Sequence, residues 1–537
     1  MYEVNLTESF FPAQADTQLE PLSLGDMLRR GAAKWPDAPA LREITLSGDV
    51  GRIWTYQELL DDSLKLGAVL GGRHKKGARV AVWAPNVPEW ILLEFGLAFA
   101  GVILVTVNPS LQHRELEYVL TQSGAEGLYY VDAFRGNPMG KIAEEVCASL
   151  PQIKHLVDIS DHDALFEGEA GELPEVTATD PAQIQYTSGT TGFPKGAILH
   201  HGGLVQNGRD TVARLNFKPG EKSLNFMPLF HTTGCAVHVL GVLGSGGNMA
   251  LQPMFDPMVS AKVIEREKIE LMVGVPTMLV ALIEVAKKTP IDYSAVRCVG
   301  SGGSMVSPEL ARAAQVFFGA KIQIVYGQTE ASPVLTTVWP DDSFEDATET
   351  IGQALPHIDL AIKSTETGAV LPVGEQGEIR ARGYNVMHGY NDNPQATAAA
   401  IDEEGWLHTG DLGVMDARGF VKITGRVKEM IIRGGENLFP VEIENEMLEH
   451  PDLAEVAVVG VADPKWGEQV ACFMRAAGAA RPSAEELKDF IRERLSPQKT
   501  PVYWIYVDAF PLTGSGKIQK LKLAQDFADD KFDVLAV

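Results

Sequence analysis

At residues 186–196 the chain reads Tyr186-Thr187-Ser188-Gly189-Thr190-Thr191-Gly192-Phe193-Pro194-Lys195-Gly196. This stretch separates an apolar segment that ends at Ile184 from a helical segment that starts near His201. Its three glycines allow a tight turn with backbone N–H groups pointing inward, while the hydroxyl groups and the lysine add donors and a positive charge. Such a loop suits a polyphosphate. It differs from the common NTPase loop, because a glycine follows the lysine where that loop needs serine or threonine.

Short apolar runs rich in β-forming residues alternate with helical stretches around this loop. Strands are expected at 79–83, 270–274 and 321–325, and helices at 260–267 and 308–318. This alternation predicts layered α/β structure with largely parallel sheets. The most apolar window, 91–107, contains Glu94 and ends at Asn-Pro, so we expect a buried helix running into a buried strand and not a membrane span.

The pattern changes after Thr350. Shorter strands are expected at 359–362, 377–381 and 419–423, typical of a small β-rich module, and the α/β pattern returns beyond Arg426. There a helix is expected at 440–449, a strand at 454–461 and a helix at 484–495. We therefore predict a large N-terminal domain (1–426) of layered α/β subdomains plus the β-rich module, a hinge at 427–428, and a small mobile α+β C-terminal domain (429–537).

Composition excludes several classes of protein. A chain of 537 residues is too long for one core. A net charge of -25 argues against nucleic acid as a partner. The four cysteines are far apart without metal-ligand spacing, and the N-terminus lacks a basic stretch followed by an apolar run. We expect a cytoplasmic protein with reduced thiols and no transmembrane segment, and a homodimer stays open.

The loop at 186–196 closely resembles the signature of the adenylate-forming (ANL) superfamily, which includes acyl- and aryl-CoA synthetases, adenylation domains of nonribosomal peptide synthetases, and firefly luciferase. Further stretches are similar to the family's remaining motifs, in the same order and at similar separations. They comprise a gate motif, an adenine-side turn, a nucleotide motif, a ribose motif and three later motifs. These lie at 227–234, 300–304, 326–330, 405–411, 425–429, 434–437 and 512–517.

The resemblance implies that the protein converts a small-molecule carboxylic acid, ATP and coenzyme A to acyl-CoA, AMP and diphosphate through an acyl-adenylate. Attack of a carboxylate on the α-phosphorus joins two anions, so charge neutralisation and positioning are the main tasks. Glu330 is the expected anchor for Mg²⁺, supported by the hydroxyl of Thr187. The triphosphate is expected to bind residues of the loop: Thr187, Ser188, Gly189, Thr190, Thr191, Gly192 and Lys195.

The same resemblance assigns the nucleoside contacts. Asp411 is expected to accept hydrogen bonds from both ribose hydroxyls, with a further ribose contact from Arg426. Tyr326 should stack on the adenine. The remaining contacts are expected from Gly303 and Ser304 at the base edge and from Gln328 and Thr329 near the α-phosphate.

Four side chains are expected to act in catalysis: Lys517, His231, Glu330 and Lys428. In the family, a lysine at the position of Lys517 bridges the acid's carboxylate and the α-phosphate during adenylation. Lys428 matches the hinge position, about which the small domain rotates between half-reactions. After rotation, Gly434, Gly435 and Glu436 would line the pantetheine passage. His231 either orients the carboxylate or moves aside for the thiol, and Trp466 either packs near the CoA nucleotide or simply fills space.

The expected acyl pocket is open at Gly327, where acetate-specific relatives carry a tryptophan. Its walls are expected to be small or apolar, from Cys235, Ala236, Val239, Gly302, Gly327 and Ala331. This favours a neutral medium-chain, branched, thioether or aryl acid. Two alternatives are an enzyme that loads a separate carrier protein and a nucleotide sensor without turnover. The sensor is disfavoured, because every catalytic position of the family is filled.

Overall fold

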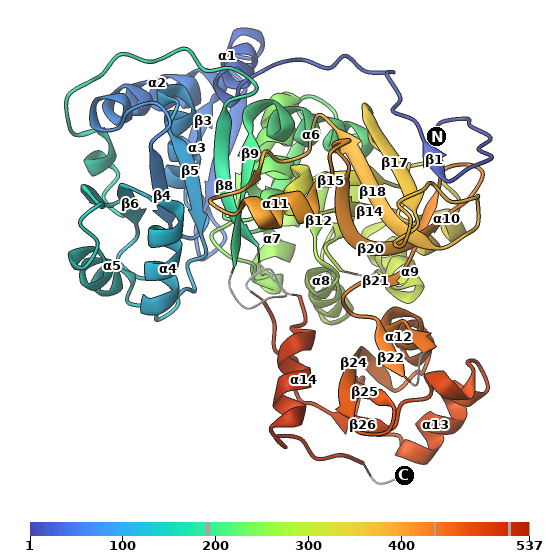
Figure 1. The fold of residues 1–537 in the computed structure, drawn as a ribbon. Helices are drawn as coiled ribbons and strands as arrows, with labels where there is room; N and C mark the ends of the chain where they lie inside the picture. The colour runs from blue at the N-terminus through green and yellow to red at the C-terminus, as the bar shows by residue number, and fades with distance from the viewer. Residues whose placement is uncertain (188–193, 305, 434–435, 514–516, 536–537) are drawn as a thin grey trace. The chain divides into compact units, whose positions relative to one another are not determined.

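The computed structural model, drawn as a ribbon in Figure 1, describes residues 1–187, 194–304, 306–433, 436–513 and 517–535. The chain divides into two compact units. The first unit comprises Met1–Glu3, Phe11–Leu360 and Ala381–His408. The second comprises Val4–Phe10, Ala361–Arg380 and Thr409–Val537. The predicted hinge at 427–428 stays a prediction.

A seven-stranded sheet of the first unit contains the two strands that flank the phosphate loop, β8 and β9. Its order is β19-β9-β8-β5-β4-β6-β7. The five strands from β8 to β7 in this order run parallel, whereas β9 is antiparallel to both β8 and β19. The strands are β4 (Arg79–Trp83), β5 (Ile103–Val107), β6 (Gly127–Tyr130), β7 (His155–Asp158), β8 (Pro181–Thr187), β9 (Lys195–His200) and β19 (Gly389–Tyr390).

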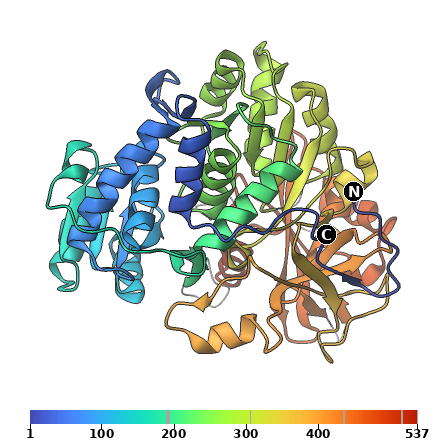
Figure 2. The same ribbon diagram turned by 90° about the horizontal axis from the view of Figure 1, so that it is seen from above.

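Helices accompany this sheet as the alternation predicts. The helix α3 (Pro88–Ala100) is buried along its whole length and leads through Gly101, in the left-handed conformation, into β5. This confirms the buried helix and strand expected at 91–107. Helices α1 (Leu24–Lys34) and α2 (Tyr56–Arg73) pack together and against α3 (Figure 2), and α4 (His113–Ser123) and α5 (Met139–Ala148) lie beside β5 and β6.

A nine-stranded sheet of the first unit has the order β16-β15-β14-β13-β12-β10-β11-β2-β3. Its middle, from β14 to β2, is parallel, and its edges are antiparallel. The strands are β2 (Pro39–Ile44), β3 (Val50–Thr55), β10 (Lys222–Asn225), β11 (Asn248–Leu251), β12 (Leu271–Gly274), β13 (Cys298–Gly302), β14 (Ile322–Gly327), β15 (Val334–Thr337) and β16 (Gln353–Ala354). The strands expected at 270–274 and 321–325 are confirmed.

The remaining helices of the first unit include the two expected at 260–267 and 308–318. The two expected helices are α7 (Pro257–Glu267) and α9 (Pro308–Phe318). The others are η1 (Asp163–Phe166), α6 (His201–Arg214), the π-helix η2 (Thr233–Val242), α8 (Pro276–Lys288), η3 (Thr329–Ala331), α10 (Phe344–Glu349) and α11 (Pro394–Ala400). Helices α6 and η2 approach each other closely at Gly208. A Cβ at this position would lie only 2.5 Å from the carbonyl oxygen of Ala236. Only glycine permits this separation.

A five-stranded sheet of order β1-β17-β18-β20-β21 forms the β-rich module expected after Thr350. Its strands are β1 (Phe10–Phe11), β17 (Ile358–Lys363), β18 (Gly377–Gly383), β20 (Leu407–Met415) and β21 (Val421–Arg426). Strands β20 and β21 pair antiparallel, with Asp411 opposite Arg426.

The second unit contains a last sheet, β23-β22-β25-β24, with β26 beside β25. Its elements are β22 (Ile431–Arg433), β23 (Glu436–Leu438), α12 (Pro440–Leu448), β24 (Leu453–Asp463), β25 (Gly467–Ala476), α13 (Ala484–Arg492), η4 (Pro497–Lys499), β26 (Tyr503–Tyr506) and α14 (Lys520–Ala528). The strand expected at 454–461 is confirmed. The helix expected at 484–495 ends earlier, at Arg492. Pro497 disfavours helical angles at the residue before it, and Ser496 is accordingly extended, so the helix has to end before Ser496.

Both faces of this last sheet are buried. Along β24, Val456 and Val458 belong to one apolar cluster with Ile443 of α12, whereas Val459 and Val461 belong to another with Leu523 of α14. Successive side chains of a strand point to opposite faces, so a continuous apolar run becomes the middle layer between helices. No described helix of the chain has the length and apolar character that a membrane span requires.

Candidate active site

The flanks of the phosphate loop form a two-stranded antiparallel hairpin. Thr187 ends β8 opposite Lys195, which begins β9, and the Thr187 hydroxyl donates to the Lys195 carbonyl at 3.4 Å. The hairpin therefore brings together a predicted metal-supporting hydroxyl and the predicted phosphate-binding lysine. The predicted phosphate contacts Ser188, Gly189, Thr190, Thr191 and Gly192 lie outside the described residues.

A tyrosine that sequence reasoning missed connects this hairpin to Glu330. Strand β19 pairs with β9, Tyr390 opposite Ala197, and the Tyr390 hydroxyl donates to Glu330 Oε1 at 2.6 Å. The Lys195 ammonium lies 5.3 Å from the centre of the Tyr390 ring. Burial and the Glu330 carboxylate raise the pKa of Tyr390 well above its usual value, so the phenol stays protonated and donates.

These side chains fit ATP and Mg²⁺. A carboxylate held in place by a phenol, a nearby hydroxyl and a lysine ammonium are the groups that a magnesium–triphosphate complex requires, because Mg²⁺ in such sites takes one or two carboxylates and completes its shell with water and phosphate oxygens. Glu330 and Thr187 would hold the metal, and Lys195 would pair with phosphate. When bound, Mg²⁺ would offset the charge of the departing diphosphate.

Glu330 lies in the short helix η3 with the predicted nucleotide residues next to it. Gln328 precedes η3 and its N–H donates to Pro333, while Thr329 and Ala331 belong to the helix. Asn385 fixes the end of η3, because its side-chain amide donates to the Ala331 carbonyl at 2.8 Å. Tyr326 is buried in β14, whereas Gly303 and Ser304 are exposed beyond β13.

The gate motif is held by Asn86, a buried residue that sequence reasoning also missed. Its side-chain nitrogen donates to the carbonyls of Met227 and Gln252 at 2.9 and 3.1 Å, and its oxygen accepts from Leu229 N–H at 2.9 Å. His231 follows in the turn that leads into η2, half-buried, and its Nδ1 accepts from Thr233 N–H at 3.3 Å. The side-chain amide of Asn86 therefore holds the backbone on both sides of Pro228, three residues before His231.

Three predicted pocket residues, Cys235, Ala236 and Val239, are fully buried on η2. Polar groups lie behind the first of them. The Gln185 amide donates to Cys235 Sγ at 3.1 Å and to Gln183 at 2.7 Å, and Gln183 donates to Glu94 at 2.7 Å. Burial raises the pKa of the Glu94 carboxyl well above its usual range, which favours its neutral form. A chain of hydrogen-bonded polar side chains thus supports the predicted pocket residue Cys235.

The two predicted pocket glycines have a local reason to be glycine. A Cβ on Gly327 would lie 2.0 Å from the Pro333 carbonyl oxygen, and a Cβ on Gly302 would lie 1.9 Å from that of Val325. Both distances are shorter than any real contact, so backbone packing alone forbids a side chain at these positions. The missing side chain at Gly327 is therefore weaker support for a long acid than the sequence pattern indicates.

In the second unit, the predicted ribose contacts lie side by side. Arg426 Nε donates to Asp411 Oδ1 at 2.5 Å across strands β21 and β20. Asp411 is buried, while Arg426 is half exposed at 48% of its side chain. The pairing of adjacent strands brings these two residues together across fifteen positions of sequence. Lys428, the predicted hinge residue, is exposed two positions further on.

The predicted catalytic lysine, Lys517, is exposed in the same unit, and its backbone pairs with that of Thr513. The Thr513 N–H donates to the Lys517 carbonyl at 2.7 Å, and the Lys517 N–H donates to the Thr513 hydroxyl at 3.0 Å. Of the predicted pantetheine contacts, Gly434 and Gly435 lie outside the described residues and Glu436 begins β23. Trp466 is 41% exposed, with Arg433 and Lys465 close to its ring.

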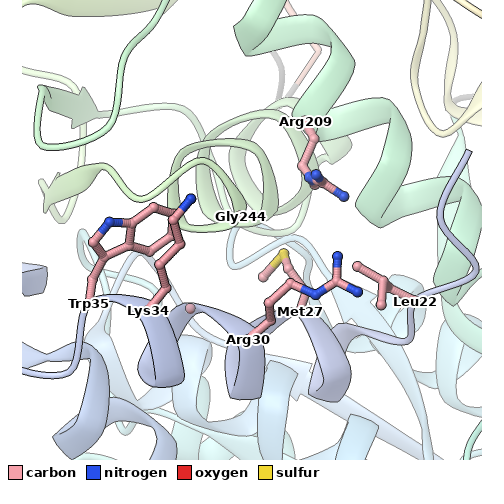
Figure 3. A pocket seen from close by; sticks show the side chains of 8 residues that line it. Leu22, Met27, Arg30, Lys34, Trp35, Arg209 and Gly244 are labelled. Carbon is pink, nitrogen blue, oxygen red and sulfur yellow. The ribbon is translucent and has the colours of Figure 1, made fainter. Parts of the chain in front are cut away.

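A pocket of about 180 Å³ opens beside α1 and α6 and contains none of the predicted site residues (Figure 3). Its lining residues are Leu22, Met27, Arg30, Gly31, Lys34, Trp35, Arg209 and Gly244. In Figure 3 the guanidinium groups of Arg30 and Arg209 point toward one another. Both form ion pairs with Glu20, so this carboxylate already occupies them.

The layered α/β fold, with Lys195 on the β8–β9 hairpin and Glu330 held by Tyr390 of the adjoining strand β19, fits an adenylate-forming enzyme. Comparison with known proteins agrees: the AMP-binding enzyme family matches residues 28–391, and the AMP-binding enzyme C-terminal domain matches residues 442–517. The chain belongs to the AMP-binding enzyme family.

Relatives match along nearly the whole chain. The putative acyl-CoA synthetase YngI of Bacillus subtilis is 36% identical and covers 94% of this chain and 96% of its own. The mitochondrial medium-chain acyl-CoA ligase ACSF2 of Mus musculus is 34% identical and covers 96% of this chain and 89% of its own. The ATP-bound crystal structure of MatB from Rhodopseudomonas palustris matches with a TM-score of 0.85 and 28% identity, over 95% of this chain and all of that one.

These findings confirm the expected superfamily, the α/β fold class, and the enzyme class of AMP-forming acyl-CoA synthetases, with ATP, Mg²⁺ and coenzyme A as the cofactors of that class. The individual site residues, the hinge, the cytoplasmic location and the homodimer stay predictions.

Proposed function

We propose that the protein is an acid–CoA ligase that joins a carboxylic acid to coenzyme A through an acyl-adenylate. The observation that carries this proposal is the arrangement of Glu330, Tyr390 and Lys195 at the mouth of the β8–β9 hairpin. In the first half-reaction, a carboxylate oxygen of the acid attacks the α-phosphorus of ATP and the bond to diphosphate breaks. In the second, the thiol sulfur attacks the acyl carbonyl, the thiol proton is released, and AMP leaves.

The chain's own residues bind and orient the reactants. Lys195 pairs with phosphate, and Tyr390 keeps the Glu330 carboxylate turned in one direction, so that little reorganisation accompanies the change of charge at phosphorus. Asp411 binds the ribose, and Arg426 orients the Asp411 carboxylate by a hydrogen bond. Lys517 holds the acid's carboxylate beside the α-phosphate during the first half-reaction.

The two half-reactions need different groups at one place, so the C-terminal domain rotates about Lys428 between them. An exposed hinge residue can change its backbone angles without breaking a packed core, and Lys428 is exposed. After the rotation, the segment that contains Glu436 lines the pantetheine passage.

The acid is a neutral medium-chain, branched, thioether or aryl acid. The buried Cys235, Ala236 and Val239 support this choice, and so does the relative named as a medium-chain acyl-CoA ligase. The alternative is that the acyl group passes to a separate carrier protein in place of free coenzyme A.

A panel of acids tests this function. Purified protein is incubated with ATP, Mg²⁺ and each acid, with and without coenzyme A, and AMP and diphosphate are measured. Steady AMP release only with coenzyme A supports the ligase, with medium-chain, branched, thioether or aryl acids ahead of acetate and dicarboxylic acids. Diphosphate release without any increase on adding coenzyme A would favour the carrier protein, and intact ATP with every acid would contradict both.

A further inference from the structure

Lys520 is a largely enclosed lysine that the reaction described above does not use. It begins α14, three residues after Lys517, and only 21% of its side chain is exposed. Its ammonium lies 2.9 Å from Glu429 Oε2 and 2.8 Å from Glu444 Oε1. The two carboxylates outweigh the cost of burial and raise the pKa of Lys520, so the ammonium is charged throughout the neutral range.

The two carboxylates come from different parts of the second unit. Glu444 lies on α12, is nearly buried, and also accepts from the Val458 N–H of β24 at 2.6 Å. It belongs to the packed body of the unit. Glu429 is the residue that directly follows the proposed hinge residue Lys428, and 29% of its side chain is exposed. Lys520 therefore connects the packed body to the first residue beyond the hinge.

The same lysine follows the stem of the loop that carries Lys517. Leu512 and Ile518 form a β-bridge across the stem, and Gln519 donates to the carbonyls of Pro511 and Leu512 at 2.8 and 2.7 Å. The chain then enters α14 at Lys520. Lys520 is thus the residue that directly follows one arm of the stem.

Docking of α14 does not require the contact with Glu429. The helix buries Leu523 in an apolar cluster with Val459 and Phe473, and Phe527 packs against the same cluster. The salt bridge to Glu444 already neutralises the ammonium. The second carboxylate adds a connection to the residue beyond the hinge, whereas Leu523 and Phe527 already anchor α14.

We propose that Lys520 is a positioning residue that clamps Glu429 to the body carrying Lys517, which confines the rotation to residues 427–428. This inference rests on the hinge and catalytic roles proposed above for Lys428 and Lys517. When the Lys520–Glu429 salt bridge is formed, the distance and orientation of Lys517 relative to Lys428 are fixed. When this salt bridge is broken, residues beyond Lys428 can also change their backbone angles. The ammonium of Lys517 then reaches the reacting atoms in many orientations.

Four substitutions separate this role from simple structural support: Lys520→Met, Glu429→Gln, Glu444→Gln and Lys520→Arg. Lys522→Met is the matched control, since Lys522 lies on the same helix, is exposed, and forms a local ion pair with Asp526. The full chain is digested briefly with trypsin, and cleavage after Arg426 and Lys428 is measured, together with the melting temperature and the rates of both half-reactions.

Lys520→Met should be cleaved at these two bonds several times faster than Lys522→Met and should lose about tenfold or more in adenylation, because small misplacements of a catalytic group are costly. Glu429→Gln should lower adenylation at an unchanged melting temperature, and Lys520→Arg should restore most of the rate. The proposal is overturned if Lys520→Met is cleaved like the control, or if Glu444→Gln alone reproduces its defects while Glu429→Gln is silent. If the wild type activates no acid, the proposed function fails, and the tryptic pattern still tests the clamp.

Discussion

At the residue scale, the chemistry depends on how carboxylates are held. Glu330 is oriented by the phenol of Tyr390, and Asp411 by the guanidinium of Arg426. Arg426 also neutralises the negative charge of Asp411, and Tyr390 stabilises that of Glu330 by a hydrogen bond. Charge-assisted hydrogen bonds of this kind are stronger than neutral ones, so each pair presents its free lone pairs in a fixed direction.

Removing the Tyr390 hydroxyl tests the first pair. Tyr390→Phe should lower the adenylation rate about tenfold and raise the Mg²⁺ concentration needed for half-maximal rate, because Glu330 loses its orienting donor. Rates are measured by ATP–diphosphate exchange over a Mg²⁺ series. Tyr293→Phe is the control, since the buried Tyr293 hydroxyl has no hydrogen-bond partner among the described residues. An unchanged Mg²⁺ dependence in Tyr390→Phe would refute the role.

Lys517→Ala should reduce adenylation by orders of magnitude while leaving thioester formation from a supplied acyl-adenylate near the wild-type rate. The ammonium is needed where negative charge accumulates on phosphorus, and the thiol step has no such charge. Both half-reactions are followed separately by rapid quench. Equal loss in the two steps would disprove the assignment.

Asp210 gives the first unit a dependence on pH. Burial raises the pKa of this carboxyl to about 6, although Tyr384 and Gln206 donate to it. Because the folded pKa exceeds the unfolded one, its contribution to stability is highest in acid and is lost as pH rises through about 6. Between pH 5 and 7.5, the wild type should lose about 1 kcal/mol of unfolding free energy relative to Asp210→Asn, measured with urea. A constant difference between the two proteins would contradict this.

At the scale of elements, short strands and turns far apart in sequence build the site. Strand β19 has two residues and pairs with β9, and this alone places Tyr390 beside Lys195. The π-helix η2 carries three predicted pocket residues and begins at Thr233, within the gate motif 227–234. Such helices are rare and concentrate at functional sites, in accord with the predicted gate.

Gly327, the last residue of β14, shows how an element limits substitution. Gly327→Ala should lower the melting temperature and the rates with all acids together, because its Cβ would press on Pro333 and Val334. Thermal melts and the acid panel measure both effects. Gly478→Ala is the matched control, with open space around the added methyl. A change of acid preference at full stability would instead make Gly327 a selectivity residue.

At the scale of the whole molecule, the proposed rotation separates two reactions in time. The second unit carries Asp411, Arg426, Lys428 and Lys517, whereas the hairpin, Glu330 and the pocket residues belong to the first. Among these four residues of the second unit, Lys517 follows the proposed pivot, whereas Asp411 and Arg426 precede it, so the proposed rotation would move Lys517 and leave the ribose contacts in place.

Lys428→Pro tests the rotation. A proline restricts the backbone at the pivot, so adenylation should stay within a few-fold of the wild type while thioester formation falls at least about a hundredfold. Single-turnover measurement of each half-reaction gives the two rates. If both rates are unchanged, Lys428 is not the pivot.

The sequence by itself determined the class of protein, the layered α/β architecture and most of the candidate site. Its motifs are contiguous stretches, such as 186–196 and 326–330, and the strand and helix periods within them depend on neighbours along the chain. Helices α3 and α9 and strand β4 could be predicted for the same reason.

Only the tertiary structure decided which side chains meet. Tyr390 reaches Glu330 from sixty residues away, Lys520 reaches Glu429 from ninety-one, and Asn86 reaches the gate motif from more than a hundred. No periodicity links such positions, because the pairing of strands and the packing of helices bring them together. Likewise, the glycine at 327 follows from the carbonyl of Pro333 facing it, a neighbour that local sequence does not reveal.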